Sequence, residues 1–493
     1  MTRYVCIHGH FYQPPRESPW TGAIENQPSA APFSNWNHRI ANECYLANAE
    51  ASILNDEGDV VEKINNYDAI SYNFGPTLLS WMDASVPGLS SALVSADKRS
   101  LERWGHGTAM AQIYHHAILP LCSVEDKETE VRWGVADFEH RYGRRPEGMW
   151  LSETAADVAS LEALAAQGIV FTLLAPRQAN KVRALDSKGA WSQVNERTID
   201  TTQAYLCRLP SGRTINLFFY DGDLAMEVAF RGALNNGEAF AHQIVSRARG
   251  ANPGALIHYA TDGESYGHHH RYGEMALAYC IKTLQGFDDV QLCNYATYLT
   301  KNPPKFEVQI HQPSSWSCAH GVGRWSANCG CVIDPALAGK QEWRAILRDG
   351  LNRLRDRINE AFLAECADLV EDPFELRHRW LGASLKGTTD ELIRELQKKK
   401  LSKIQRKSLV TWMEIQKYAL MMFTSCGWFF DDPAGLEPVQ ILRYAARAIE
   451  LFETHTGLDL QSSFVADIAT MRSQSEKTPT GFEIWAGLVM KES

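Results

Sequence analysis

The sequence predicts an α/β fold over residues 1–300, followed by an α-helical region over residues 301–493. Up to about residue 300, short apolar runs alternate with helical patterns, which is typical of a mainly parallel sheet with helices outside it. From about Lys301 onward, helical periodicity dominates. A chain of 493 residues is long enough for two domains, or for one large α/β barrel with an appendage.

Six apolar runs are predicted strands. They are Tyr4–His10, Ala69–Phe74, Glu147–Glu153, Ile169–Ala175, Ile215–Asp221 and Ala255–Asp262. The stretch from Ala155 to Gly168 between two of them has helical character, and Gly168 is expected to end that helix.

In the C-terminal part, one apolar stripe has helical spacing. Its members lie at i, i+4, i+7 and i+11, and they are Leu347, Leu351, Leu354 and Ile358. This spacing predicts one buried helix face. The segment Lys301–Phe306, with two prolines, is expected to be a linker.

Composition excludes several functional classes. The formal net charge is −10, which makes non-specific nucleic-acid binding a poor hypothesis. No run of about 18 apolar residues predicts a membrane span, and the N-terminus lacks the apolar core of a signal peptide. The 11 cysteines are scattered, which favours reduced thiols and a cytoplasmic location. No cofactor is expected, and the sequence leaves the oligomeric state open.

Several predicted strands end in polar or charged residues. They are His8 and His10, Asn73, Glu153, Asp221 and Asp262. In a parallel barrel, groups at the carboxyl ends of strands converge on one mouth, where such folds do chemistry. The neighbouring residues are aromatic and glycine, which is unlike a solvated turn.

Two of these strand-end residues are carboxylates that follow apolar walls. Glu153 follows Met149, Trp150 and Leu151, and Asp262 follows Tyr259 and Ala260. A carboxyl group in an apolar pocket has a raised pKa, and a second one nearby separates the two titrations. Two such groups facing one bond are the arrangement of glycoside hydrolysis.

A metal site is the alternative for the histidines. His8 and His10 form a His-x-His pattern that resembles the metal-binding pattern of amidohydrolases, and His115, His116 and the run His268–His270 could add ligands. A zinc hydrolase or deacetylase would need a set of such ligands around an open position.

A second cluster lies in the loop-like segment after residue 312. Cys318, His320, Cys329 and Cys331 are close in sequence and could ligate a structural zinc ion. Their spacings are tighter than those of common zinc knuckles, so buried free thiols with a ligand-facing histidine are the simpler interpretation.

Together, these motifs resemble glycoside hydrolase family 57, over nearly the whole chain. "HGHFYQPP" is similar to the family's first motif, "WLSE" to its nucleophile motif and "DGESYGHHH" to its acid/base motif. "YNFGPTLLSWM" looks like the family's second-strand segment, and "SSWSCAHGVGRW" is similar in place to the fifth motif, which closes over the cleft.

The resemblance implies a distorted (β/α)7 barrel (1–300) and a helical domain (301–493) that contributes to the active-site cleft. It implies a retaining glycosidase or transglycosylase acting on α-linked glucan, with Glu153 as nucleophile and Asp262 as acid/base. The residues expected to bind the oligo- or polysaccharide substrate are His8, His10, Gln13, Trp150, Asp221, Glu264, His268, Trp316 and His320.

One motif departs from the family pattern. Where the family has a glutamate after a glycine, this chain has Met110 and no carboxylate, and His106 or Gln112 is the candidate substitute. This departure leaves the natural substrate open, and the sequence does not decide between hydrolysis and transfer. A metal-dependent hydrolase or deacetylase and a non-catalytic carbohydrate-binding protein remain the alternative functions.

Overall fold

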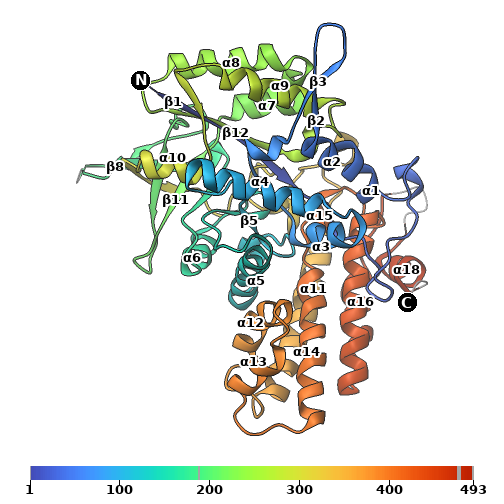
Figure 1. The fold of residues 1–493 in the computed structure, drawn as a ribbon. Helices are drawn as coiled ribbons and strands as arrows, with labels where there is room; N and C mark the ends of the chain where they lie inside the picture. Colours follow the sequence, from blue (N-terminus) through green and yellow to red (C-terminus); the bar gives the residue numbers. More distant parts are fainter. Residues whose placement is uncertain (1, 187–188, 475–478, 491–493) are drawn as a thin grey trace. The chain divides into compact units, whose positions relative to one another are not determined.

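The computed structural model describes residues 2–186, 189–474 and 479–490 (Figure 1). The chain divides into two compact units that are interleaved along the sequence. Unit 1 contains Met1–Gln13, Glu25–Gln112 and Arg141–Gln312, and unit 2 contains Pro14–Ile24, Ile113–His140 and Pro313–Ser493. Each unit is described by itself.

Unit 1 is built around parallel strands. They are β1 (Arg3–Phe11), β4 (Ser71–Phe74), β5 (Ala111–Gln112), β6 (Met149–Trp150), β7 (Phe171–Leu174), β11 (Thr214–Phe219), β12 (Leu256–Asp262) and β13 (Val290–Leu292). Strand β1 pairs in parallel with β12, β4 and β13. The pairs β5–β6 and β7–β11 are also parallel.

Isolated contacts link these pairs to one another. Single parallel bridges join Tyr72 to Ala109 and Gly148 to Phe171. The amide of Asp221, just after β11, donates to the carbonyl of His258 in β12 at 2.8 Å. Neighbouring strands therefore follow one another in the order β12, β1, β4, β5, β6, β7, β11.

A mixed extension continues from β11. Its strands are β10 (Ala204–Arg208), β14 (Phe306–Ile310), β8 (Ala179–Ala184) and β9 (Ser192–Gln193), which complete a six-stranded sheet with β7 and β11. Strands β10 and β14 pair in parallel, and the other neighbouring strands of the extension pair antiparallel. The expected linker Lys301–Phe306 thus leads directly into β14. A separate hairpin consists of β2 (Ala51–Leu54) and β3 (Val60–Ile64).

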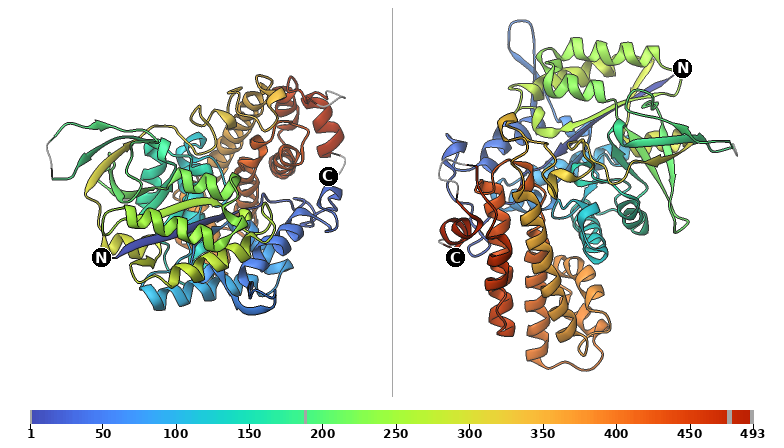
Figure 2. Two further views of the ribbon diagram at one scale, coloured as in Figure 1. Left: turned by 90° about the horizontal axis from the view of Figure 1, so that it is seen from above. Right: turned by 180° about the vertical axis from the view of Figure 1, so that it is seen from behind.

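Helices of unit 1 cover the strands. They are α1 (Trp36–Ile40), α2 (Leu46–Ala49), α3 (Pro76–Ser85), α4 (Leu89–Trp104), α6 (Val158–Ala166), α7 (Gly222–Phe230), α8 (Gly237–Gly250), α9 (Gly273–Gln285) and α10 (Tyr295–Lys301). Helices α8 and α9 lie side by side, with α8 packed on β1 and β12 and α9 on β2 and β13 (Figures 1 and 2). Gly168 has a left-handed φ of 79° just after α6, as a residue that ends a helix requires.

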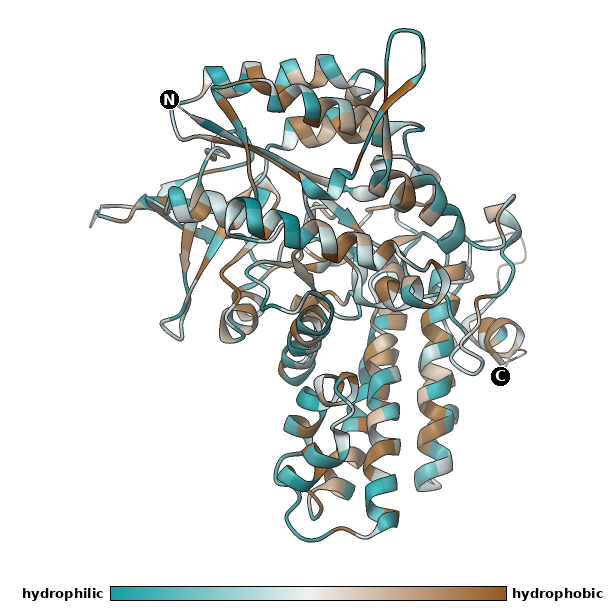
Figure 3. Cartoon of the chain, viewed as in Figure 1, coloured by the Kyte–Doolittle hydropathy of each residue, from teal (hydrophilic) through white to brown (hydrophobic). Residues whose placement is uncertain are grey.

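Unit 2 is mainly helical. Its helices are α11 (Trp343–Cys366), α12 (Pro373–Leu385), α13 (Thr389–Leu396), α14 (Lys403–Met421), α15 (Cys426–Phe429), α16 (Leu436–Thr456), α17 (Gln461–Ile468) and α18 (Gly481–Ile484). Helix α5 (Val124–Tyr142) spans the boundary between the units. Hydrophobic and hydrophilic residues alternate along α11, α14 and α16 (Figure 3). All four residues of the predicted stripe on α11 are buried.

The α/β prediction and the helical C-terminal region are confirmed. All six predicted strands exist, most of them shorter than expected. Among the described residues, no helix is both long and apolar enough to cross a membrane. The strand register also places the site, because His10 is the Cα partner of Asp262 on β12 and of Asn73 on β4.

Candidate active site

Glu153 lies in a strained turn directly after β6. Its φ and ψ are 58° and 22°, and the next residue, Thr154, has a φ of 49°. Non-glycine residues rarely adopt this left-handed conformation, and for a β-branched residue it is an outlier. Such strain persists only where the surroundings hold it, and it clusters at functional sites.

Gln178 holds this strained turn in place. The hydroxyl of Thr154 donates to Oε1 of Gln178 at 2.8 Å, and Nε2 of Gln178 donates to the carbonyl of Thr154 at 2.9 Å. The amide of Ala175 also donates to Oε1 of Gln178, at 2.9 Å. The Gln178 side chain is fully buried, so these bonds do not compete with water. The side-chain amide of Gln178 therefore binds both the side chain and the backbone of Thr154, the residue after Glu153.

Asp262 is the last residue of β12, and its carboxyl group is close enough to Glu153 for the two charges to repel. Its side chain reaches solvent, yet the surrounding protein displaces enough water to raise the pKa of Asp262 to about 7. The negative charge of Glu153 raises this pKa further. A carboxyl group with such a pKa carries a proton for part of the time at neutral pH.

Glu264 is a second carboxyl group with a raised pKa in the same turn. Its Oε1 accepts from the hydroxyl of Tyr45 at 2.5 Å and from the amide of Tyr12 at 3.1 Å. Burial raises the pKa of Glu264 to about 8, with a further contribution from Asp262. Asp262 ionises first, and its charge then opposes the ionisation of Glu264.

The histidines of β1 form a buried network with Asn73. Because Oδ1 of Asn73 can only accept, Nε2 of His8 donates to it, at 3.0 Å. Nδ1 of His8 lies 3.1 Å from the hydroxyl of Ser71. The Asn73 amide then donates to Nδ1 of His10 at 2.9 Å. Burial lowers the pKa of His8 to about 3, so its ring is neutral.

Trp150 packs flat against both histidines. Its ring centroid lies 5.1 Å from that of His8 and 4.8 Å from that of His10, with interplanar angles of 17° and 18°. Tyr12 also stacks on His10, with a distance of 6.0 Å between the two ring centroids. Trp150 is fully buried. The stacked rings of Trp150 and Tyr12 thus hold the imidazole rings of His8 and His10 near the strand ends.

Of the two candidate substitutes for the missing glutamate, the structure brings Gln112 to this network. Its Oε1 accepts from the Asn73 amide at 2.6 Å. His106 instead pairs with Glu147 at 2.7 Å. Met110 is buried.

Two further predicted residues have protein partners around the site. His268 pairs with Glu43, which also binds Arg39. Asp221 caps α7 through the amide of Leu224 at 3.0 Å and pairs with Arg247 at 2.7 Å.

The remaining predicted residues have different settings. Nε2 of Gln13 donates to the carbonyl of Tyr12 at 2.9 Å. Trp316 and His320 belong to unit 2, where Trp316 is half-buried and His320 is exposed.

Sequence reasoning missed the residues that support the site. Gln178 follows β7 in a short 3-10 helix, and Tyr45 lies in a π-helical segment, so neither stands at a strand end. Asn73 was predicted as a polar residue at the end of its strand, although its bonding to both histidines was not predicted.

Two families match the sequence. The family described as "Glycosyl hydrolase family 57" matches residues 40–311, and the family described as "Domain of unknown function (DUF3536)" matches residues 340–493. No curated protein sequence matches this chain.

Solved structures with similar folds have low sequence identity. An exo-type maltose-forming amylase from Pyrococcus sp. ST04 has a TM-score of 0.69 at 14% identity, covering 95% of this chain and 82% of that one. An α-amylase from Thermotoga maritima has a TM-score of 0.58 at 12% identity, with 95% and 96% covered. A branching enzyme from Thermococcus kodakaraensis has a TM-score of 0.52 at 14% identity, with 92% and 94% covered.

Proposed function

Because the chain belongs to glycosyl hydrolase family 57, we propose that it is a retaining glycosidase or transglycosylase acting on α-linked glucans. The observation that carries this proposal is the pairing of Glu153 with Asp262, whose pKa lies near 7. The amylases and the branching enzyme that share its fold support an α-glucan or oligosaccharide substrate.

The two carboxyl groups have complementary roles in this mechanism. The Glu153 carboxylate attacks the anomeric carbon while Asp262 donates its proton to the departing glycosidic oxygen. Asp262, now ionised, then takes a proton from water or from a sugar hydroxyl that attacks the glycosyl-enzyme. Retention requires the carboxyl groups to lie about 5–5.5 Å apart, and the mutual repulsion of this pair supports their proximity.

The neighbouring residues position this pair. Gln178 holds the turn that carries Glu153. Glu264 follows Asp262 in the same turn, and its carboxyl group accepts hydrogen bonds from Tyr45 and Tyr12. His10, Asn73 and Gln112 form the polar network from which sugar hydroxyls would be bound. Both ring nitrogens of His8 already have protein partners, so His8 acts by orienting Asn73 and Trp150.

The finer architecture is part of the proposal. The strand order from β12 through β1 to β11, with its single bridges, supports a distorted (β/α)7 barrel. The domain boundary near residue 300, the part of residues 301–493 in the cleft, the contact of Trp316 with sugar and the cytoplasmic location stay predictions.

The roles of the two carboxylates can be assigned by chemical rescue. Azide added to Glu153→Ala should attack an activated α-glucoside directly and give a β-glucosyl azide, because the nucleophile is absent. Azide added to Asp262→Ala should give the α-glucosyl azide, because it intercepts the glycosyl-enzyme. The same product from both variants would contradict the assignment.

Hydrolysis and transfer are separated by their products. The wild-type chain should release reducing sugar from a maltooligosaccharide, form longer oligosaccharides from it, or do both. Chromatography of the products over time decides between them. Absence of any product across a panel of α-glucans would overturn the α-glucan proposal.

A further inference from the structure

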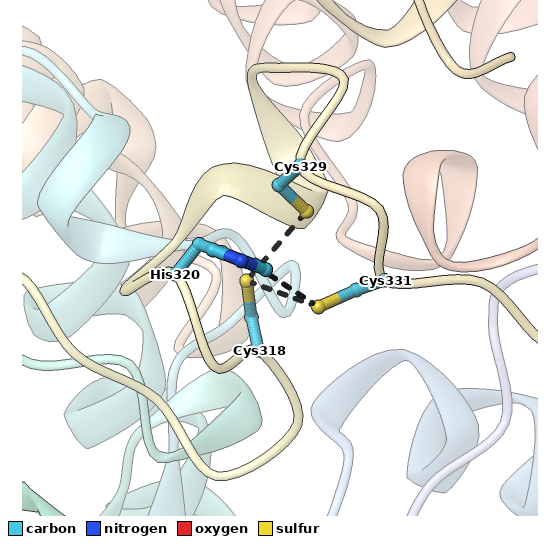
Figure 4. A group of neighbouring side chains, drawn as sticks. All are labelled: Cys318, His320, Cys329 and Cys331. Atoms are coloured by element: carbon cyan, nitrogen blue, oxygen red, sulfur yellow. Dashed lines mark hydrogen bonds between the residues drawn. The ribbon is translucent and has the colours of Figure 1, made fainter. Parts of the chain in front are cut away.

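Unit 2 contains a group of four side chains that the proposed glycosidase does not use. Cys318, His320, Cys329 and Cys331 converge from one segment, and their side chains point toward a common centre (Figure 4). One ligand atom from each lies within 4.8 Å of the others. Among the described residues, this is where three or more metal-ligating side chains gather closely enough to hold an ion.

The separations between these atoms match a tetrahedral zinc centre. The Sγ atom of Cys318 lies 3.9 Å from that of Cys329 and 3.8 Å from that of Cys331. The Sγ atom of Cys331 lies 3.5 Å from Nδ1 of His320. Tetrahedral Zn²⁺ with Zn–S bonds of about 2.3 Å and a Zn–N bond of about 2.0 Å needs S···S separations of about 3.8 Å and S···N separations of about 3.5 Å.

A disulfide does not account for this arrangement. All three cysteines are free thiols, and their sulfur atoms are too far apart for an S–S bond of about 2.05 Å. Three thiols and an imidazole around one point are soft ligands of the kind that bind zinc.

Glycines allow the short spacers between the ligands. One residue separates Cys329 from Cys331, and that residue, Gly330, has a left-handed φ of 81°. This conformation is readily accessible to glycine. A Cβ atom on Gly323 would lie 2.9 Å from Cβ of Cys329, so a side chain there would displace a ligand. The tight spacing is therefore compatible with four converging ligands.

The surroundings also fit a thiolate-rich centre. The amide of Arg324 donates to the sulfur of Cys318 at 3.4 Å. The buried guanidinium of Arg344 donates to the carbonyl of Cys331 at 2.7 Å, and Arg344 also pairs with Asp431. Partners of this kind orient metal ligands and offset the net negative charge of three thiolates around Zn²⁺.

The segment that carries the ligands has little regular structure of its own. Between residues 313 and 342 it contains two short 3-10 helices, Gly323–Trp325 and Pro335–Leu337. Long loops of this kind in compact proteins are uncommon unless they are functional. A closed set of four protein ligands is typical of structural zinc, which stabilises a fold directly.

We propose that Cys318, His320, Cys329 and Cys331 bind one structural zinc ion that orders residues 313–342. His320 is then a metal ligand through Nδ1, in place of the sugar contact expected from the sequence. Binding requires the three thiols to release their protons to solvent, and it needs no oxidant or reductant.

Metal content of the full-length chain tests the proposal. Protein produced in zinc-supplemented cells and purified without chelator should contain about one zinc ion per chain. The double variant Cys329→Ser/Cys331→Ser should contain at least about tenfold less zinc per chain. Cys426→Ser is the matched control, because Cys426 is a cysteine of unit 2 that forms no disulfide and lies outside the cluster, and this variant should keep its zinc.

Cobalt substitution keeps the test informative if the double variant fails to fold. Co²⁺ added to the metal-free wild-type chain should give the intense visible absorption of a tetrahedral thiolate site, and one equivalent of Zn²⁺ should abolish it. A wild-type chain that holds no zinc and gives no such absorption would overturn the proposal. Bound iron with inorganic sulfide, or a disulfide among these cysteines in protein kept under reducing conditions, would overturn it as well.

Discussion

The strand-end site of unit 1 and the thiol cluster of unit 2 hold their functional groups by different means. Glu153 follows β6 and Asp262 ends β12, and the fold holds these two mutually repelling carboxyl groups near each other. The four residues of the thiol cluster lie on a segment with little secondary structure. The first site depends on the scaffold for its precision, whereas the second would acquire its rigidity from the ion that it binds.

Loss of the nucleophile tests the first half of this contrast most strongly. Glu153→Gln should lower kcat/KM for an α-glucan by at least about 10³-fold, because no glycosyl-enzyme forms. Glu238→Gln, which changes an exposed carboxylate on α8, should leave kcat/KM unchanged. Steady-state kinetics on both variants decides, and a Glu153→Gln enzyme with near wild-type activity would remove the basis of the assignment.

The pH profile tests the role of Asp262. As the proton donor, Asp262 must be protonated, so kcat/KM should fall as pH rises through about 7. Asp262→Asn should lower kcat by about 10²–10⁴-fold. A profile that stays flat from pH 6 to 9 would contradict the assignment.

The same raised pKa also makes stability fall as pH rises. The folded protein binds the Asp262 proton more tightly than the unfolded chain does, so stability falls as pH rises from about 4 to about 7. Asp262→Asn removes this loss of stability, so the substitution should raise the melting temperature at pH 8 more than at pH 4. Equal shifts at both pH values would show that the raised pKa is absent.

Gln178 tests whether the scaffold supplies the precision. Gln178→Leu leaves the carbonyl of Thr154 and the amide of Ala175 without their buried partner, which should cost about 2–4 kcal/mol of unfolding free energy. Relaxation of the turn should also lower kcat by about 10–100-fold, with a smaller change in KM. Denaturant unfolding and kinetics measure the two effects, with Gln193→Leu on an exposed strand as control. Wild-type kcat in a destabilised variant would limit Gln178 to a structural role.

Removal of zinc by a chelator should affect the stability of unit 2 and leave catalysis in unit 1 nearly unchanged, which is the smallest catalytic effect expected here. Removing zinc should lower the melting temperature by roughly 5–10 °C. At a temperature where the protein stays folded, kcat/KM should change by less than about twofold, because the carboxylate mechanism needs no metal. Loss of activity on chelation, together with activity in Glu153→Gln, would favour a metal-dependent hydrolase instead.

Strand positions and strand-end chemistry could be predicted because both depend on local pattern. Buried parallel strands are continuous apolar runs, so polar residues such as His10 and Asp262 stand out where these runs end. The linker expected at Lys301–Phe306 was wrong at its end, because Phe306 begins β14 and pairs with β8 and β10. Its two prolines are a local signal, whereas the strand is stabilised by partners distant in sequence.

The sequence by itself determined the α/β order and the helical C-terminal region, and it pointed to Glu153 and Asp262 as the candidate carboxylates, since each follows from periodicity or motif. Only the tertiary structure decided that Gln178 holds the turn at Glu153, that Asn73 joins two histidines, and that four residues around Gly330 converge on one point. Backbone strain, burial and hydrogen-bond partners depend on distant segments meeting in space. Water removal and the nearby charge of Glu153, which both raise the pKa of Asp262, also depend on segments that meet only in the folded chain.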